Sequence, residues 1–136
     1  MASASASIDI PASADQVWQL IGDFNSLPNW LPFIPKSELG EGGKLRTLET
    51  ADGAVIVERL QAHDDAGKTY SYSIEQAPFP VTDYLASILV EARGQGSRVT
   101  WSGRFTPNGV SDDEAQALFT GIYQGGLEAL RANFPG

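Results

Sequence analysis

The sequence predicts an α+β domain in which a curved antiparallel sheet of about six to seven strands wraps around one long C-terminal helix, with two short helices after the first strand. Segment 111–134 has apolar residues at spacings of three and four throughout, which is typical of an amphipathic helix. Between 33 and 105, short segments with alternating apolar residues are separated by Gly, Pro and Asp turns, which indicates strands joined by hairpins. That stretch has no strand–helix–strand rhythm, so a parallel sheet is not expected.

Composition limits the class of protein. A chain of 136 residues is long enough for one domain, which we expect to span 1–136. The formal net charge of −8 disfavours nucleic acid and anionic membrane surfaces as partners. With no cysteine and a single histidine, His63, the chain offers no thiolate nucleophile and no multi-histidine site, so no metal or cofactor is expected. No apolar run approaches about 18 residues and no signal-peptide pattern opens the chain, so we expect a cytoplasmic protein without a membrane span.

The N-terminal part should contain one strand and two short helices. The strand is expected at 3–10. A helix follows at 14–21, because Ser13 and Gln16 form a capping box in which each side chain accepts a hydrogen bond from a backbone N–H of the first turn. A single helical turn is expected within 25–32, where two prolines prevent a longer helix.

The middle of the chain should form an antiparallel meander. Its strands are expected at 33–39, 44–50, 54–63, 68–75, 83–92 and 98–105. In 68–75, the residues Tyr70, Tyr72 and Ile74 alternate with polar residues, which indicates one buried and one solvated face. The alternating sets that begin at Tyr84 and at Val99 indicate the buried faces of the last two strands.

The face of strand 54–63 that points inward is left open by the sequence. Glu58 shares one face with Ile56 and Leu60, whereas Arg59 shares the other with two valines, so either choice buries a charge. On the preceding strand, Arg46 shares a face with an apolar leucine and with a lysine. The environment of Arg46 and Glu58 is therefore central to any functional hypothesis.

The helix expected at 111–134 begins with a second capping box, formed by Ser111 and Glu114. Its apolar stripe comprises Ala115, Leu118, Phe119, Ile122, Tyr123, Gly126, Leu127, Leu130 and Phe134. Glycines at 121, 125 and 126 each cost about 1 kcal/mol in a helix relative to alanine. Either a close approach to the sheet or room for a ligand would account for them.

Several motifs together resemble one superfamily. They are IDIPASADQVW at 8–18, LPNW at 27–30, GKLR at 43–46, ERL at 58–60, YSY at 70–72, PVTDY at 80–84, VTW at 99–101 and GGL at 125–127. The sequence resembles the START-like (SRPBCC) superfamily with the Bet v 1-like helix-grip fold, and within it the bacterial polyketide cyclase/dehydrase-like proteins. The resemblance covers nearly the whole chain. It implies an internal cavity between sheet and helix, but this fold hosts binders, carriers and enzymes alike.

Within the superfamily, the sequence is also similar to the plant lachrymatory-factor synthase branch. That similarity implies Glu58, Arg46 and Tyr84 as candidate catalytic residues. If they face inward, Glu58 would be a general acid/base, Arg46 would bind an anionic or oxygen-bearing group, and Tyr84 would donate to a developing oxyanion. The alternative places Arg46 and Glu58 in an ion pair on the outer sheet face, where it would contribute less than about 1 kcal/mol.

Aromatic and apolar side chains are the candidate ligand-binding residues. They are Tyr70, Tyr72, Trp101, Ile88, Phe119, Tyr123 and Trp30. Ordinary core packing is the alternative for some of the tyrosines and for Trp101. Trp30 would either be a lid over the cavity mouth or pack beneath a loop. His63, beside two aspartates at a strand end, is expected to be a solvated turn residue.

The sequence thus supports three functional hypotheses. The first is binding of a small hydrophobic molecule in an internal cavity, by a monomer or a homodimer. The second is a cofactor-free cyclase, dehydrase or isomerase that uses Glu58 and Arg46 for acid/base chemistry. The third is a ligand-gated protein-interaction module, which an exposed apolar mouth around 27–34 would favour.

Overall fold

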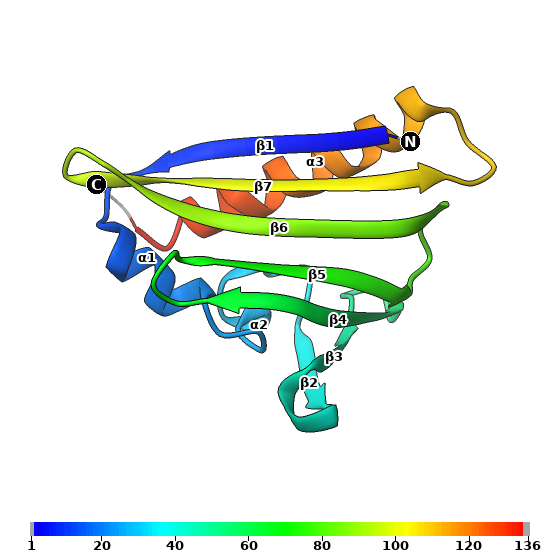
Figure 1. The fold of residues 1–136 in the computed structure, drawn as a ribbon, viewed down its shortest axis with the longest axis horizontal. Helices are drawn as coiled ribbons and strands as arrows, with labels where there is room; N and C mark the ends of the chain where they lie inside the picture. The colour runs from blue at the N-terminus through cyan, green and yellow to red at the C-terminus, as the bar shows by residue number, and fades with distance from the viewer. Residues whose placement is uncertain (1, 135–136) are drawn as a thin grey trace.

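The computed structural model describes residues 2–134 (Figure 1). Its elements are β1 (Ala2–Ile10), α1 (Ala14–Ile21), α2 (Leu27–Trp30), β2 (Lys36–Gly40), the short 3₁₀ helix η1 (Glu41–Gly43), β3 (Leu45–Glu49), β4 (Val55–Asp64), β5 (Thr69–Gln76), β6 (Val81–Arg93), β7 (Gly96–Pro107) and α3 (Asp112–Arg131). Both expected capping boxes are present, at Ser13 with Gln16 and at Ser111 with Glu114.

The strands form one seven-stranded antiparallel sheet in the order β1-β7-β6-β5-β4-β3-β2. Strands β2 to β7 are a continuous meander, and β1 closes the other edge by pairing with β7. Figure 1 shows α3 running along the face formed by β1 and β7, with α1 and α2 under the neighbouring part of the sheet. The predicted α+β architecture is confirmed.

Helix α3 packs closely on β1 because the inward residues of that strand are small. Ala2, Ala4 and Ala6 are buried, while the serines between them face outward. The apolar stripe of α3 is narrower than expected, since Leu118 is 37% exposed. The helix also ends at Arg131, so Phe134 lies beyond it and is only partly buried.

Two strand boundaries differ from the expectation for physical reasons. Strand β2 begins at Lys36, not at Phe33, because Pro32 and Pro35 have no N–H to donate to a strand ladder. The hairpin between β6 and β7 is tighter than expected, because Gly94 adopts a positive φ of 59° and lets the strands pair up to Arg93 and Gly96.

A β-bulge in β4 changes the environment of His63. Leu60 pairs with Tyr72 and Ala62 with Ser71, so Gln61 is an extra residue that shifts the alternation by one. His63 therefore lies opposite the inward residue Tyr70, and its Nε2–H donates to the Gly22 carbonyl over 2.7 Å. His63 is exposed, as expected, but it lies within β4 and not in a turn, and the bulge directs its ring toward the end of α1.

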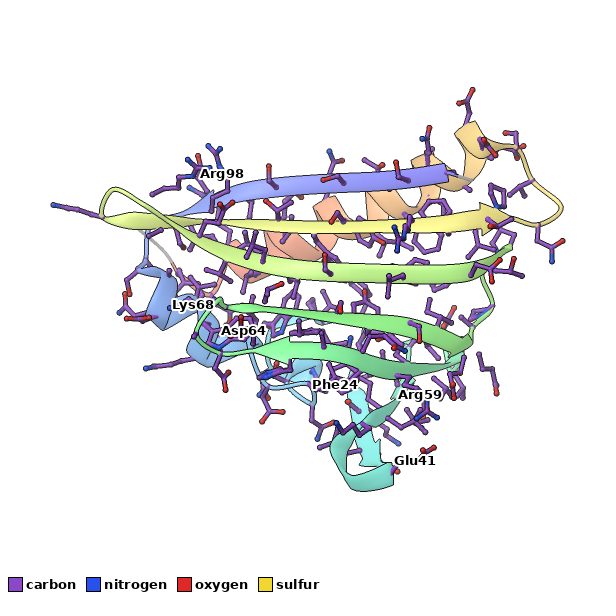
Figure 2. The ribbon with its side chains drawn as sticks, viewed as in Figure 1. Phe24, Glu41, Arg59, Asp64, Lys68 and Arg98 are labelled. Carbon is purple, nitrogen blue, oxygen red and sulfur yellow. The ribbon has the colours of Figure 1, made fainter. Side chains whose placement is uncertain are left out.

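The outer face of the sheet carries ion pairs between exposed side chains. Arg59 donates to Glu75 at 2.9 Å and to Glu41 at 3.1 Å, and Arg98 donates to Asp9 at 2.7 Å. Figure 2 shows Arg59 and Glu41 near η1 and Arg98 at the opposite end of the molecule. Within residues 2–134, no helix has the length and apolar character needed to cross a membrane.

Candidate functional site

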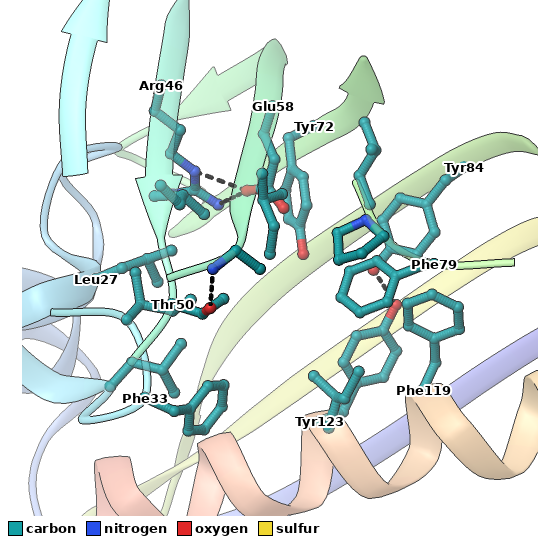
Figure 3. A pocket seen from close by; sticks show the side chains of 18 of the residues that line it. Leu27, Phe33, Arg46, Thr50, Glu58, Tyr72, Phe79, Tyr84, Phe119 and Tyr123 are labelled. Carbon is teal, nitrogen blue, oxygen red and sulfur yellow. Dashed lines mark hydrogen bonds and ion pairs between the residues drawn. The ribbon is translucent and has the colours of Figure 1, made fainter. Parts of the chain in front are cut away.

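A cavity of about 450 Å³ lies between the inner face of the sheet, α3 and the segment that contains α2 (Figure 3). It is lined by Leu27, Leu31, Phe33, Ile34, Arg46, Leu48, Thr50, Ala51, Asp52, Ala54, Ile56, Glu58, Tyr72, Ile74, Pro78, Phe79, Tyr84, Trp101, Phe119, Ile122 and Tyr123. Most of these side chains are apolar. A few convergent polar groups in an apolar pocket are typical of a small-molecule site.

Arg46 and Glu58 both point into the interior. They are directly paired across β3 and β4, and only 1% and 6% of their surfaces are exposed. Arg46 Nε donates to Glu58 Oε1 over 2.8 Å, and Arg46 Nη2 lies 2.6 Å from the same oxygen. The alternative of an ion pair on the outer face is therefore wrong. The face of β4 that points inward is the one that carries Ile56 and Glu58.

The Arg46 guanidinium is held by more than its carboxylate partner. Its Nη1 donates to the Phe24 carbonyl at 2.8 Å and to the Tyr70 hydroxyl at 3.4 Å. The rings of Phe24 and Tyr72 lie 4.1 and 5.0 Å from its central carbon, within cation–π distance. Burial opposes the charge, but Tyr70 and Glu58 outweigh that effect and keep the pKa of Arg46 above its ordinary value. Arg46 is therefore a permanently charged group that joins the sheet to the α1–α2 connection.

Only one of the two carboxylate oxygens of Glu58 is hydrogen-bonded to a described residue. Both Arg46 contacts go to Oε1, and among the described residues no donor is hydrogen-bonded to Oε2. Burial raises the pKa of Glu58 above its ordinary value, and the nearby Arg46 only partly offsets this effect. A cavity-lining carboxylate with a raised pKa and a free oxygen can exchange a proton with a bound molecule.

Tyrosine hydroxyls add further polar groups to the lining. Tyr72 accepts a hydrogen bond from Trp101 Nε1 at 3.0 Å, and the Tyr84 and Tyr123 hydroxyls are hydrogen-bonded to each other. Figure 3 shows Tyr72 between Glu58 and Tyr84, and the Tyr72 and Tyr84 rings are 6.1 Å apart. Burial raises the pKa of all three tyrosines, so they remain protonated donors at neutral pH.

The Tyr123 hydroxyl has room because residue 103 on β7 is glycine. A Cβ atom there would collide with that hydroxyl and press on Ala86. Gly126 on α3 has a similar role, since a Cβ atom would lie 2.7 Å from the Trp101 ring. Of the helix glycines, Gly126 therefore reflects close packing, whereas Gly121 and Gly125 face open space on the exposed side.

The candidate ligand-binding residues separate into two groups. Tyr72, Trp101, Phe119 and Tyr123 line the cavity, as do the three candidate catalytic residues Glu58, Arg46 and Tyr84. Tyr70, Ile88 and Trp30 are buried but are not among the lining residues. Tyr70 packs beside Arg46, and the Trp30 ring packs edge-on against Trp101 with centroids 6.0 Å apart. Packing beneath the loop therefore describes Trp30 better than an open lid.

Several lining residues were not identified as site residues from the sequence. Phe79 lies between two prolines, where no alternation of apolar and polar residues indicates that it is buried. The sequence from Thr50 to Ala54 is typical of a hairpin turn and contains no signal for a cavity wall. Ile122 belonged to the expected apolar stripe, so helical spacing could have identified it. Of the large apolar residues in 27–34, only Phe33 is exposed, at 38%. The feature that would favour a ligand-gated interaction module is thus reduced to one side chain.

Residues 2–134 contain no cluster of three or more His, Asp or Glu side chains placed to hold a metal ion. The fold and the cavity together define a START-like protein of the Bet v 1-like helix-grip class. The chain belongs to the family described as polyketide cyclase / dehydrase and lipid transport, which matches residues 1–135.

Solved structures support this assignment. XoxI from Bacillus cereus is 54% identical with a TM-score of 0.96, and the match covers 98% of this chain and 96% of XoxI. An uncharacterized protein from Bacillus thuringiensis is 52% identical with a TM-score of 0.96, and 98% of each chain is covered. A START superfamily protein from Mycobacterium smegmatis shares the fold at 14% identity, with a TM-score of 0.79 and coverage of 96% and 95%. A search of curated proteins finds no match.

Proposed function

We propose that this protein binds a small hydrophobic molecule in the cavity between its sheet and α3. The observation that carries the proposal is a partly open cavity of about 450 Å³ with a mainly apolar lining and a buried polar cluster at Arg46 and Glu58. A protein core without a ligand is normally packed to a density that leaves few voids larger than a water molecule. Burying a charged pair next to an open apolar volume is costly, which favours a binding role for that volume.

The test is native mass spectrometry of the purified protein, followed by organic extraction of any bound molecule. In parallel, the neutral fluorescent probe N-phenylnaphthylamine is titrated into protein from which such molecules have been removed. A bound hydrophobic molecule, or saturable probe binding at one site, is the expected result. An empty protein that also fails to bind the probe would overturn the proposal.

A second candidate function is cofactor-free acid/base catalysis, and the free Oε2 of Glu58 is the observation that favours it. Glu58 would remove a proton from a carbon next to a ketone, and a hydroxyl of Tyr72 or Tyr84 would donate a hydrogen bond to the resulting enolate oxygen. Protonated Glu58 would then return the proton to another carbon, or to a hydroxyl that leaves as water. These steps correspond to isomerisation and dehydration.

In this mechanism Arg46 positions Glu58 and does not bind the substrate, because its nitrogens already contact Glu58, Phe24 and Tyr70. The test is to assay Glu58→Gln on the extracted molecule or on a ketone that binds in its place. Turnover should fall far more than affinity changes. If neither turnover nor affinity changes, Glu58 has no acid/base role.

A further inference from the structure

The polar groups that line the cavity offer a hydrogen-bond acceptor on one side and hydrogen-bond donors on the other. The buried acceptor is Glu58 Oε2, since both Arg46 contacts use the other oxygen, whereas the Asp52 carboxylate in the same lining is exposed. Tyr72 accepts from Trp101 Nε1, so its own hydroxyl proton can be donated to the neighbouring Tyr84 hydroxyl or to a ligand. The Tyr84 and Tyr123 hydroxyls share one hydrogen bond, which leaves one more proton for a further acceptor. One side of the polar lining thus accepts a hydrogen bond and the other side donates.

The same lining is unfavourable for a negative charge. Its charged residues are Arg46, Glu58 and Asp52, which is one cation and two carboxyl groups. Arg46 is already bound to Glu58 and to the Phe24 carbonyl, so it does not present a free cation to the cavity. An anionic ligand would lose its hydration without gaining a counter-charge, which is strongly unfavourable in an apolar site.

We infer that the ligand of this cavity is uncharged and carries both a hydroxyl donor, for Glu58 Oε2, and a ketone-type acceptor, for the hydroxyls of Tyr72 and the Tyr84–Tyr123 pair. This inference rests on the proposed binding function and adds the chemical class of the ligand. An apolar skeleton between the two oxygen groups fills the space beside Phe79, Phe119 and Ile122. Fatty acids and other carboxylates are excluded as the preferred class.

The test uses four probes built on one naphthalene skeleton. Acetylnaphthol has both groups, acetylnaphthalene lacks the hydroxyl, ethylnaphthol lacks the ketone, and acetylnaphthoate carries a carboxylate where acetylnaphthol has its hydroxyl. The affinity of each compound for the wild-type protein is measured at neutral pH by its displacement of N-phenylnaphthylamine. Acetylnaphthol should bind about tenfold more tightly than either compound that lacks one group, because a hydrogen bond to a buried charged or polar partner has about this effect. Acetylnaphthoate should bind most weakly.

Glu58→Gln should replace the acceptor at one end of the cavity with a donor, so that this end prefers an acceptor group of the ligand over a hydroxyl. The Arg46 N–H groups need an oxygen, so the amide oxygen takes the place of Oε1 and the NH₂ group, a donor, takes the place of Oε2. Acetylnaphthol should then lose about tenfold in affinity, whereas acetylnaphthoate should gain, because it meets a donor and an Arg46 without its counter-charge. Glu75→Gln is the matched control, since Glu75 pairs with Arg59 on the outer face and should leave all four affinities unchanged.

The outcomes separate this inference from the proposed function. If no probe and no N-phenylnaphthylamine binds, the binding function itself fails. If N-phenylnaphthylamine binds but the four compounds have equal affinities, or acetylnaphthoate binds most tightly to the wild type, the cavity is a binding site and the inferred ligand class is wrong. The wild-type series decides this even if Glu58→Gln does not fold.

Discussion

Arg46 on β3 and Glu58 on β4 are paired across the two strands, and two nitrogens of the arginine approach the same carboxylate oxygen at 2.8 and 2.6 Å. Within residues 2–134, this asymmetry leaves the second oxygen of Glu58 without a hydrogen bond inside the cavity. Arg46 does not depend on Glu58 alone, because the Phe24 carbonyl and aromatic faces also stabilise its charge. The pair is therefore arranged so that Glu58 can change its protonation or bind a ligand while Arg46 stays in place.

The raised pKa of Glu58 predicts a specific dependence of stability on pH. The folded state binds this proton more tightly than the unfolded chain, whose carboxyl titrates near 4.5. The contribution of Glu58 to stability is thus fully present below the unfolded pKa and is lost as pH rises through the folded pKa. Urea unfolding of wild type and Glu58→Gln across this range should show a difference in unfolding free energy that moves in favour of the variant as pH rises.

The comparison with Glu58→Gln isolates one group, since the other carboxylates are common to both proteins. Asp9 and Glu75 have lowered pKa values from their hydrogen bonds to arginine, so their contribution is lost as pH falls, and it cancels in the difference. A difference that is constant with pH, or that moves toward the wild type as pH rises, would show that the pKa of Glu58 is not raised.

Arg46→Lys should destabilise the protein by at least about 2 kcal/mol. A lysine has one ammonium group and cannot reach Glu58, the Phe24 carbonyl and the Tyr70 hydroxyl together, so buried acceptors are left without donors. Urea unfolding measures the loss. Arg59→Lys is the control on the outer face, where water can replace the lost bonds, and a loss of the same size there would contradict the special role of Arg46.

Gly103→Ala should destabilise the protein by about 1–3 kcal/mol, because the new methyl group displaces the Tyr123 hydroxyl and breaks its bond to Tyr84. The matching experiment is a double-mutant cycle with Tyr123→Phe, which removes the hydroxyl that causes the collision. The Gly103→Ala cost should be smaller in the Tyr123→Phe background. Strictly additive effects would mean that this contact does not govern the packing of α3 on β7.

Two glycines of α3 should give the opposite effect to Gly103, namely a more stable protein when they are replaced by alanine. Gly121 and Gly125 have helical backbone, and a methyl group added at either position would have no neighbouring atom within 4 Å, so Gly121→Ala and Gly125→Ala should each stabilise the protein by about 0.5–1 kcal/mol. Thermal and urea unfolding provide the measurement. Gly126→Ala is the control and should destabilise, since its methyl group would lie 2.7 Å from Trp101 and 3.1 Å from Leu31. Stabilisation by all three substitutions would contradict the described packing.

The periodic parts of the fold could be predicted from the sequence. The helix that begins after Ser111 and the alternating strand with Tyr70 and Tyr72 follow directly from spacing and capping. The orientation of Glu58 could not, because each face of β4 carries one charge and only tertiary contacts decide between them. The contact from Arg46 to the Phe24 carbonyl joins residues 22 positions apart, and no local pattern predicts it.

Filling the cavity from α3 gives the most direct test of the binding function. Ile122 lines the cavity, so Ile122→Trp should occupy its volume and reduce N-phenylnaphthylamine binding at least about tenfold. Leu118→Trp is the matched control, because Leu118 lies one turn earlier on the same helix but is exposed and not among the lining residues. Both proteins should retain the wild-type circular dichroism spectrum. Since each variant adds the same side chain to the same helix, equal probe affinity in the two would mean that the probe binds elsewhere and that the cavity is not the ligand site.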